Sequence, residues 1–314
     1  AHWVITAAER YLSLLWDRLK KEITSCSVVH ADETPVFVVK DGREGMHKSY
    51  MWVYRNGGLQ DDHPVVLYDF QLTRKKEAPG KFLDAFTGTL VTDGYQVYHS
   101  LEKDAETQFK VAGCWAHARR KFADPVKAMG MEKAKNTVAY EALGLIQYIY
   151  RRDNELKDLK SGERKRKRKS LIRPLVNDFF RWIREVQPQV SRTSETGKAL
   201  TYCLNQEEYL RVFLENPEIP MDNNAAERAI RPFCVGKKNW KLIDTIHGAE
   251  ASAIIYSIVE TCKLNNLNIF YYISHLLTEI PKHMDDTNLD FLEDLLPWSE
   301  KLPEECKKRI AEMK

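Results

Sequence analysis

The chain has 314 residues, which is enough for one large domain or two ordinary ones. Its six cysteines are scattered without a Cys-x-x-Cys pair, so we exclude a disulfide framework and expect reduced thiols in a cytosolic protein. No apolar run of about 18 residues is present, which excludes a membrane-spanning helix. The chain begins with neither an initiator Met nor a signal-peptide pattern, so we expect an upstream region to be missing.

A formal net charge of +3 hides an uneven distribution of charge. Residues 114–173 contain 17 Lys or Arg against 7 Asp or Glu, and residues 162–169 within them predict a basic, exposed turn. Such a block favours a polyanionic partner, although a run of charge is also typical of an ordinary solvated surface.

The first elements in chain order are a helix and three strands. Residues 6–23 place apolar side chains at three- and four-residue steps, which predicts an amphipathic helix. Residues 28–35 predict a short buried strand that brings Asp32 to its end and then turns. Residues 49–55 and 64–72 are rich in aromatic and β-branched side chains, so we expect them to pair antiparallel with that strand.

Two more strands and a helical block follow. Residues 78–86 predict a short helix, residues 88–95 a strand that ends on Asp93, and residues 109–115 a fifth strand. Five strands with helices between the later ones predict an α/β fold built on a mixed sheet. After Lys121 the strand signal disappears, and helical spacing predicts an inserted helical block.

The chain then returns to the core. Asp222 is a good N-cap for a helix that carries Glu227 and that Pro232 should stop. Two further helices are predicted over residues 249–263 and 267–280. We therefore expect five segments: an N-terminal helical segment (1–27), a first part of the core (28–121), a basic helical insertion (122–216), a second part of the core (217–284) and a C-terminal tail (285–314).

Three acidic residues are candidates for a metal site. Asp32 and Asp93 lie at the carboxyl ends of predicted strands, where sheets commonly present functional groups, although either alone could simply cap a turn. Glu227 lies on a helix beside Arg228 and Arg231, whose guanidinium groups suit phosphate oxygens. Carboxylates that cluster need a compensating cation, so convergence of the three acids would predict divalent metal ions. Spacing alone does not establish that convergence.

Several motifs are spread over nearly the whole chain. They are HADETP (30–35), LVTDGYQVY (90–98), GCWAHARRKF (113–122), MDNNAAERAIRP (221–232), GKKNW (236–240), GAEASAIIYSIVETCKLNNLN (248–268) and LPWSEKLP (296–303). Together and in this order they resemble the insertion sequence 66 family of bacterial DDE transposases. The resemblance implies a ribonuclease-H-like five-stranded mixed sheet with flanking helices and an all-helical insertion before the catalytic glutamate. It also implies that the DDE triad falls on Asp32, Asp93 and Glu227.

This resemblance carries expectations about chemistry and partners. The triad would hold two Mg²⁺ or Mn²⁺ ions roughly 3.5–4 Å apart, for cleavage and strand transfer at transposon ends. The partners would be transposon-end and target DNA, the complex would be a homodimer, and the place would be the bacterial cytoplasm, at the nucleoid when DNA is bound. Full-length members carry an upstream helical, zinc-binding region that nothing here matches, so the chain would be a catalytic fragment or come from a decayed element.

Some acids and one histidine have competing interpretations. Glu33 should point to the opposite strand face from Asp32. Asp222 is better explained as a cap but is the alternative metal ligand to Glu227. His117 either contacts phosphate or is hydrogen-bonded within the fold, and its spacing from Cys114 without a second pair argues against zinc. DNA backbone contacts are expected from Arg119, Arg120, Lys121, Arg164, Lys165, Arg166, Lys167, Arg168, Lys169, Lys237 and Lys238.

Two other functions remain open at this point. A ribonuclease-H-like nuclease or resolvase would share the triad but lack strand transfer. A catalytically silent DNA-binding remnant would keep the basic surface without metal-dependent activity.

Overall fold

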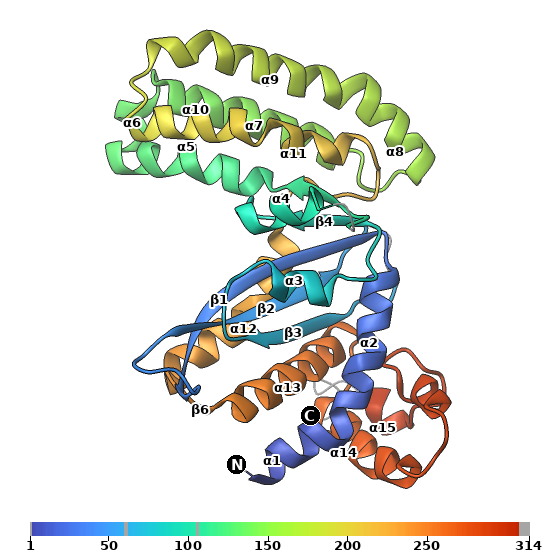
Figure 1. Cartoon of the computed structure of the whole chain (residues 1–314). Coiled ribbons are helices and arrows are strands. Elements are labelled where there is room, and N and C mark those ends of the chain that lie inside the picture. Colours follow the sequence, from blue (N-terminus) through green and yellow to red (C-terminus); the bar gives the residue numbers. More distant parts are fainter. Residues whose placement is uncertain (1, 60–61, 105–106, 308–314) are drawn as a thin grey trace. The chain divides into compact units, whose positions relative to one another are not determined.

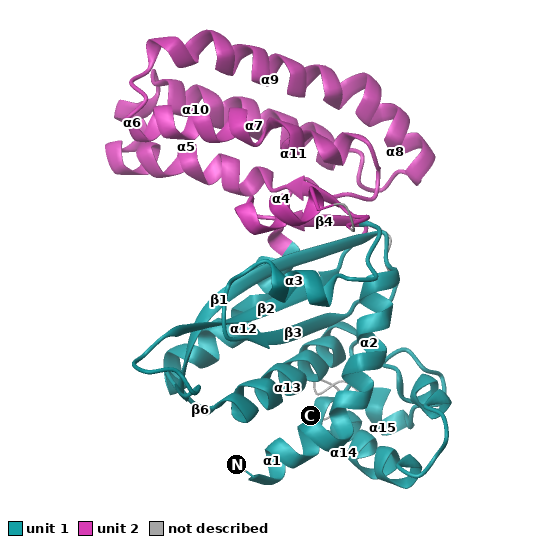
Figure 2. Cartoon of the chain, viewed as in Figure 1, with its two compact units in different colours: residues 1–57, 61–88, 225–314 teal, residues 58–60, 89–224 magenta. Residues whose placement is uncertain are grey.

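A computed structural model describes residues 2–59, 62–104 and 107–307 of the chain (Figure 1). They divide into two compact units, which Figure 2 shows in separate colours. Unit 1 comprises residues 1–57, 61–88 and 225–314, and unit 2 comprises residues 58–60 and 89–224. None of the helices formed by the described residues combines the length and the apolar character that a membrane-spanning helix needs.

Unit 1 is built on an antiparallel sheet of three strands in the order β3-β2-β1. These are β1 (Val28–Lys40), β2 (Lys48–Asn56) and β3 (Val66–Gln71), and the short strand β6 (Ile243–Thr245) pairs parallel with the far end of β1. Alternation along β1 and β2 assigns each side chain to one face. Asp32 lies opposite Val53 and Thr34 lies opposite Met51, so these residues share a face.

Helix α12 (Asn224–Trp240) packs along that face of the sheet (Figure 1). Its buried residues recur at helical spacing (Ala226, Ala229, Ile230 and Phe233) and join one apolar cluster with strand residues that include Val36, Val38, Met51 and Val53. The opposite face carries Tyr54, whose ring stacks on Phe82 of α3 (Glu77–Phe82) with centroids 3.6 Å apart. Burial on both faces explains why the strands combine apolar and aromatic residues.

The outer edge of β3 is covered by α13 (Ile246–Leu264). The amides of Val66 and Tyr68 donate to the hydroxyls of Thr261 (3.0 Å) and Ser257 (2.7 Å), so backbone groups of an edge strand are satisfied by a helix. The remaining elements of unit 1 are α1 (His2–Ala7), η1 (Ala8–Leu12), α2 (Ser13–Ser25), α14 (Ile269–Glu279), η5 (Ile280–His283), η6 (Asp290–Leu295) and α15 (Glu304–Lys307).

Unit 2 combines a parallel strand pair with helices. Strands β4 (Thr89–Thr92) and β5 (Lys110–Gly113) run parallel, and Trp115 is buried among Phe179, Phe180 and Phe213. The helices are α4 (Gln96–Glu102), α5 (Trp115–Met129), α6 (Met131–Ala134), α7 (Val138–Asn154), α8 (Ser161–Lys167), η2 (Arg168–Ile172), α9 (Arg173–Val186), η3 (Gln187–Gln189), α10 (Glu195–Asn205), α11 (Glu207–Arg211) and η4 (Val212–Leu214).

The predicted fold class is confirmed. The strand order is β3-β2-β1-β4-β5, a mixed sheet with flanking helices that is consistent with a ribonuclease-H-like fold. The two compact units differ from the five segments expected from the sequence, because β4, α4 and β5 group with the helices that follow them. Those segment boundaries stay a prediction.

Three local expectations are wrong. Strand β1 does not turn after Pro35 but continues to Lys40, so Asp32 lies within a strand; β1 pairs with β2 through this region, and extended geometry suits the residue before a proline. The fifth strand ends at Gly113, and helix α5 already begins at Trp115. Helix α12 passes through Pro232, because its buried stripe continues to Phe233 beyond the missing amide.

The basic stretch at residues 162–169 is helical rather than an exposed turn, and two of its arginines are buried. Arg164 is 2 % exposed and donates to the carbonyls of Leu156, Lys157 and Leu159. Arg168 is 1 % exposed and forms a bidentate ion pair with Asp153 (2.8 and 2.9 Å). The expectation that these two arginines are exposed for DNA is therefore wrong, because their guanidinium groups satisfy buried acceptors.

Arg168 also holds the chain segment that leads back toward α12. Its Nη1 lies within hydrogen-bond distance of four carbonyls, those of Phe213 (2.9 Å), Asn216 (3.2 Å), Pro217 (3.3 Å) and Ile219 (2.8 Å). Burying a charge without such partners would be unfavourable, so the arginine and its acceptors depend on each other.

Arg168→Ala should lower the free energy of unfolding by about 3–5 kcal/mol, because it leaves Asp153 and several carbonyls buried without their partner. Urea unfolding followed by circular dichroism measures the change. The exposed neighbour Lys169 provides the control, since Lys169→Ala should stay within about 0.5 kcal/mol of the wild type. Equal effects of the two substitutions would contradict the structural role of Arg168.

Candidate active site

Asp32 lies in the middle of β1, on the face that α12 covers. It is half-buried, and its Oδ1 accepts a hydrogen bond from the amide of Glu33 (2.8 Å). Two residues farther along the same face, buried Thr34 receives a hydrogen bond from Lys237 of α12. Asp32 of β1 and Lys237 of α12 therefore lie on the same side of the sheet in unit 1.

Glu227 lies in the first turn of α12 and is half-buried. Its neighbour Ala226 is fully buried in the same apolar cluster as Val53, the strand partner of Asp32. A carboxylate in the first turn of a helix is stabilised by the partial positive charge of the exposed amides there. Arg228 and Arg231, the predicted phosphate contacts, are both exposed.

Asp93 belongs to unit 2 and directly follows the last residue of β4. Its Oδ1 accepts a hydrogen bond from the amide of Tyr95 (2.9 Å), and its carbonyl accepts one from the Tyr202 hydroxyl (3.1 Å). The turn depends on Gly94, whose φ of +90° favours glycine. Tyr202 was not predicted as a site residue, because no local signal connects residues 109 positions apart.

The start of α12 is attached to the end of β5 within unit 2. The amide of Trp115 donates to the carbonyl of Met221 (2.9 Å), and the amide of Asn223 donates to Sγ of Cys114 (3.2 Å). Asp222 accepts a hydrogen bond from the amide of Asn224 (3.1 Å), the first residue of α12, so its carboxylate closes the turn that leads into the helix. Burial raises the pKa of the Cys114 thiol to about 12.

Glu33, one of the two rival acids, has a separate partner. It lies opposite Trp52 on the other face of the sheet and forms an ion pair with Arg74. Its side chain is only 4 % exposed. The register of β1 therefore confirms that Glu33 and Asp32 point to opposite faces of the sheet.

The basic residues after β5 lie on helix α5 rather than at a strand end. His117 is half-buried, and its Nε2 lies 3.2 Å from Nη1 of Arg120. Arg119 and Arg120 are exposed, and the ammonium of Lys121 lies 4.6 Å from the centroid of the Tyr202 ring. Because Tyr202 also bonds Asp93, this basic segment and the aspartate share a partner within unit 2.

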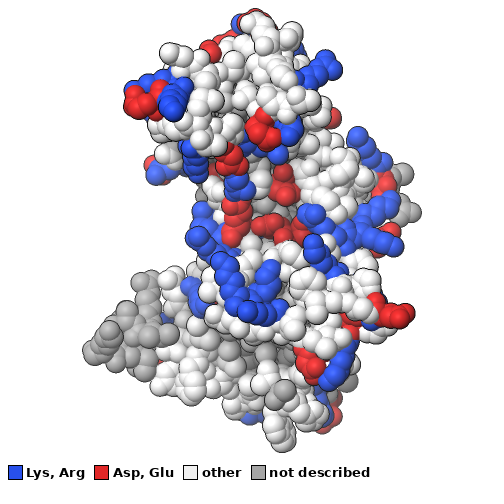
Figure 3. Space-filling model, turned by 90° about the vertical axis from the view of Figure 1, so that its left-hand side faces the viewer, with Lys and Arg blue, Asp and Glu red and all other residues white. Residues whose placement is uncertain are grey.

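Charged side chains of both signs occupy the surface. On the face drawn in Figure 3, Lys and Arg side chains are interspersed with Asp and Glu side chains. Lys165, Arg166, Lys167 and Lys169 are exposed, unlike the two arginines between them. The basic block predicted from the sequence therefore has an exposed part and a buried, structural part.

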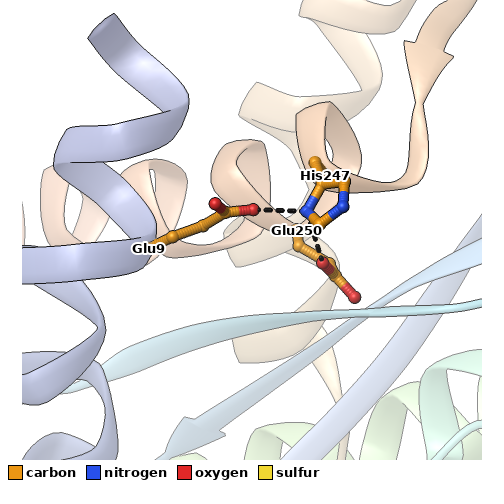
Figure 4. A group of neighbouring side chains, drawn as sticks. All are labelled: Glu9, His247 and Glu250. Carbon is orange, nitrogen blue, oxygen red and sulfur yellow. Dashed lines mark hydrogen bonds and ion pairs between the residues drawn. The ribbon is translucent and has the colours of Figure 1, made fainter. Parts of the chain in front are cut away.

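A different group of possible metal ligands lies elsewhere in unit 1. Among the described residues, Glu9, His247 and Glu250 have ligand atoms within 4.8 Å of one another, and all three are exposed (Figure 4). Nδ1 of His247 lies 2.6 Å from Glu9 and 4.0 Å from Glu250. The hydrogen bond to Glu9 raises the pKa of His247, as expected of a surface ion pair that connects η1 with α13. None of these residues was predicted as a site residue.

Comparisons with known proteins match almost the whole chain. The family model described as "Transposase IS66 family" matches residues 1–251, and the model described as "IS66 C-terminal element" matches residues 257–298. Three proteins of Sinorhizobium fredii, called uncharacterized proteins y4qI, y4jD and y4hP, are 29 %, 28 % and 27 % identical to the chain. The alignments cover 92 %, 92 % and 90 % of the chain but 53 %, 57 % and 52 % of the relatives, so the chain spans about half of their length.

The first family model covers the segments that carry Asp32, Asp93 and Glu227, and the second covers α14 and the short helices η5 and η6 of unit 1. This chain therefore belongs to the IS66 family of transposases.

Proposed function

We propose that the chain is the catalytic region of a DDE transposase, which cleaves DNA strands at transposon ends and joins them to target DNA in a metal-dependent reaction. The observation that supports this most directly concerns the contacts of α12, the helix that carries Glu227. Its buried residues pack on the β1 face that bears Asp32. Asn223, which directly precedes the helix, donates its amide to Cys114, the residue after β5, and β5 pairs with β4.

The packing within unit 1 supports a pairing of Glu227 with Asp32. Lys237, near the far end of α12, donates to Thr34 and to the carbonyl of Pro35. The chain then enters β6, which pairs with β1 at Val38 and Lys40, so α12 advances along β1 in the strand's own direction. The ten residues from Lys237 back to Glu227 span about 15 Å, toward the part of β1 that contains Asp32.

The contacts within unit 2 support a pairing of Asp93 with the same helix end. Thr92 pairs with Gly113, so the next residues, Asp93 and Cys114, leave neighbouring strands whose axes are about 4.8 Å apart. Cys114 accepts the amide of Asn223, which directly precedes α12. Glu227 follows within the first helical turn.

The donor set suits Mg²⁺ or Mn²⁺, because hard divalent ions prefer carboxylate oxygens and a cluster of three carboxylates needs compensating positive charge. We propose Asp32, Asp93 and Glu227 as the ligands; two bound ions would polarise the scissile phosphate and stabilise the attacking and leaving oxygens. Exposed Arg228 and Arg231, with His117, would contact phosphate oxygens and orient the strand.

The reaction would have two phosphoryl transfers. Water first attacks the phosphodiester at the transposon end and breaks its bond to the 3′-oxygen, which leaves as a 3′-hydroxyl. That hydroxyl then attacks a target phosphodiester, forming a new bond while the target's own 3′-oxygen leaves. We further propose a homodimer, since two ends must be held together, acting on DNA in the cytoplasm. The relatives are about twice as long as this chain, so any activity of a whole protein of that length is part of this proposal.

Each of Asp32→Ala, Asp93→Ala and Glu227→Gln should reduce Mg²⁺-dependent cleavage and joining of cognate ends to the uncatalysed background, because each removes a proposed metal ligand. Asp222→Asn is the matched control: it keeps an oxygen to accept the Asn224 amide, and it should retain activity. A gel assay of labelled transposon ends, with and without EDTA, measures both steps.

The outcomes separate the competing functions. Full activity of one triad variant would remove that residue from the site, and loss of activity in Asp222→Asn with activity kept in Glu227→Gln would exchange their roles. Cleavage without joining by the wild type would indicate a nuclease or resolvase. Binding of DNA without either reaction would indicate a silent remnant.

Replacing Lys165, Arg166, Lys167 and Lys169 together by Gln should weaken binding to DNA of any sequence, because the exposed side of this basic helix is proposed to contact phosphates. The slope of log K against log salt should fall by about 0.9 for each phosphate that the variant no longer neutralises. Fluorescence anisotropy at several salt concentrations measures it.

A second set of four lysines gives a charge-matched control. Each is exposed and already pairs with an acid: Lys263, Lys282, Lys301 and Lys307. Their replacement by Gln should change the salt dependence less. Equal effects of the two sets would show that only total charge matters.

A further inference from the structure

Lys237 makes an unusual contact for a lysine near a helix end. Its Nζ donates to Oγ1 of Thr34 (2.8 Å) and to the carbonyl of Pro35 (2.7 Å), both on β1. In the part of the chain that the structure describes, no carboxylate pairs with Lys237. The hydrogen bonds of a charged donor are roughly twice as strong as neutral ones, so the contact is a firm link between α12 and β1.

The link joins the elements of two proposed metal ligands. Thr34 lies two residues after Asp32 on the same strand face, and it is only 8 % exposed. Lys237 follows the buried positions of α12 at helical spacing, four residues after Phe233, so its side chain points to the sheet. Its neighbour Lys238 is exposed and has no such contact among the described residues.

The charge of Lys237 and its contact with β1 should affect metal binding in opposite directions. A lysine near Asp32 repels a cation, so loss of its charge alone would tighten binding of a divalent ion. A lysine that fixes α12 against β1 also sets the position of Glu227 relative to Asp32. Loss of that contact would therefore weaken the binding of a divalent ion. Small displacements of catalytic groups reduce rates by up to about a hundredfold.

We propose that Lys237 is a positioning residue: through Thr34 and Pro35 it fixes the register of α12 on β1, and thereby the separation of Glu227 from Asp32. This role rests on the proposed metal-dependent function. It differs from the DNA contact expected of Lys237 from its sequence context, because the ammonium is directed to β1.

The experiment compares Lys237→Met, Thr34→Val, the double variant and the control Lys238→Met in the 314-residue chain. Mn²⁺ affinity is measured by calorimetry, cleavage by the labelled-end assay, DNA binding by fluorescence anisotropy and folding by thermal unfolding. Lys237→Met should weaken Mn²⁺ binding and slow cleavage, each by about tenfold or more. Thr34→Val, which leaves the Pro35 carbonyl available, should have a smaller effect of the same sign.

The double variant should match Lys237→Met alone, because both substitutions remove the same contact. Lys238→Met should leave the Mn²⁺ affinity unchanged, and any loss should be confined to DNA binding. Additive effects, tighter Mn²⁺ binding in Lys237→Met, or loss of DNA binding in Lys237→Met with a silent Thr34→Val would overturn the positioning role.

Two results keep this proposal distinct from the proposed function. A wild-type chain that neither binds Mn²⁺ nor cleaves DNA would overturn both. A wild type that does both, with silent Lys237→Met and Thr34→Val variants, would overturn the positioning role alone. If Lys237→Met does not fold, Thr34→Val, which keeps the charge, still tests the contact by the same readouts.

Discussion

The packing of α12 on one face of the β1–β2–β3 sheet is the contact on which the candidate site depends. Ala226, Ala229, Ile230 and Phe233 bury an apolar stripe against the strands, and burial of this kind is the main favourable term in folding. The helix continues past Pro232, and Phe233 directly after the proline is part of the buried stripe. Glu227 therefore lies on an element whose position is set by the core, and a site on such an element is held more firmly than one on a loop.

Much of the sheet in unit 1 is predictable from residue patterns. Aromatic and β-branched runs identify β2 and β3, and the period-two alternation of a strand separates Asp32 from Glu33. Local rules fail where tertiary packing decides the outcome. Thr34-Pro35 predicts a turn, yet pairing with β2 continues the strand, and Pro232 predicts a helix end, yet the buried stripe continues past it.

The basic block shows a second limit of prediction. Six successive cationic residues indicate an exposed run, and sequence alone does not distinguish a solvated guanidinium from a buried one. Arg164 and Arg168 are buried because carbonyls from the distant segment 213–219, with Asp153, supply their acceptors. The same applies to Tyr202 and Lys237, whose partners are 109 and 203 residues away. The acids of the candidate site are identified by their family motifs, whereas the residues that position them have no local signal.

A crystal structure of the chain with Mn²⁺ and anomalous scattering data tests the central claim most directly, because it locates each ion without assuming its ligands. We predict two ions per chain, roughly 3.5–4 Å apart, held by Asp32, Asp93 and Glu227. Ions bound instead at Glu9, His247 and Glu250, with none at the three acids, would contradict it.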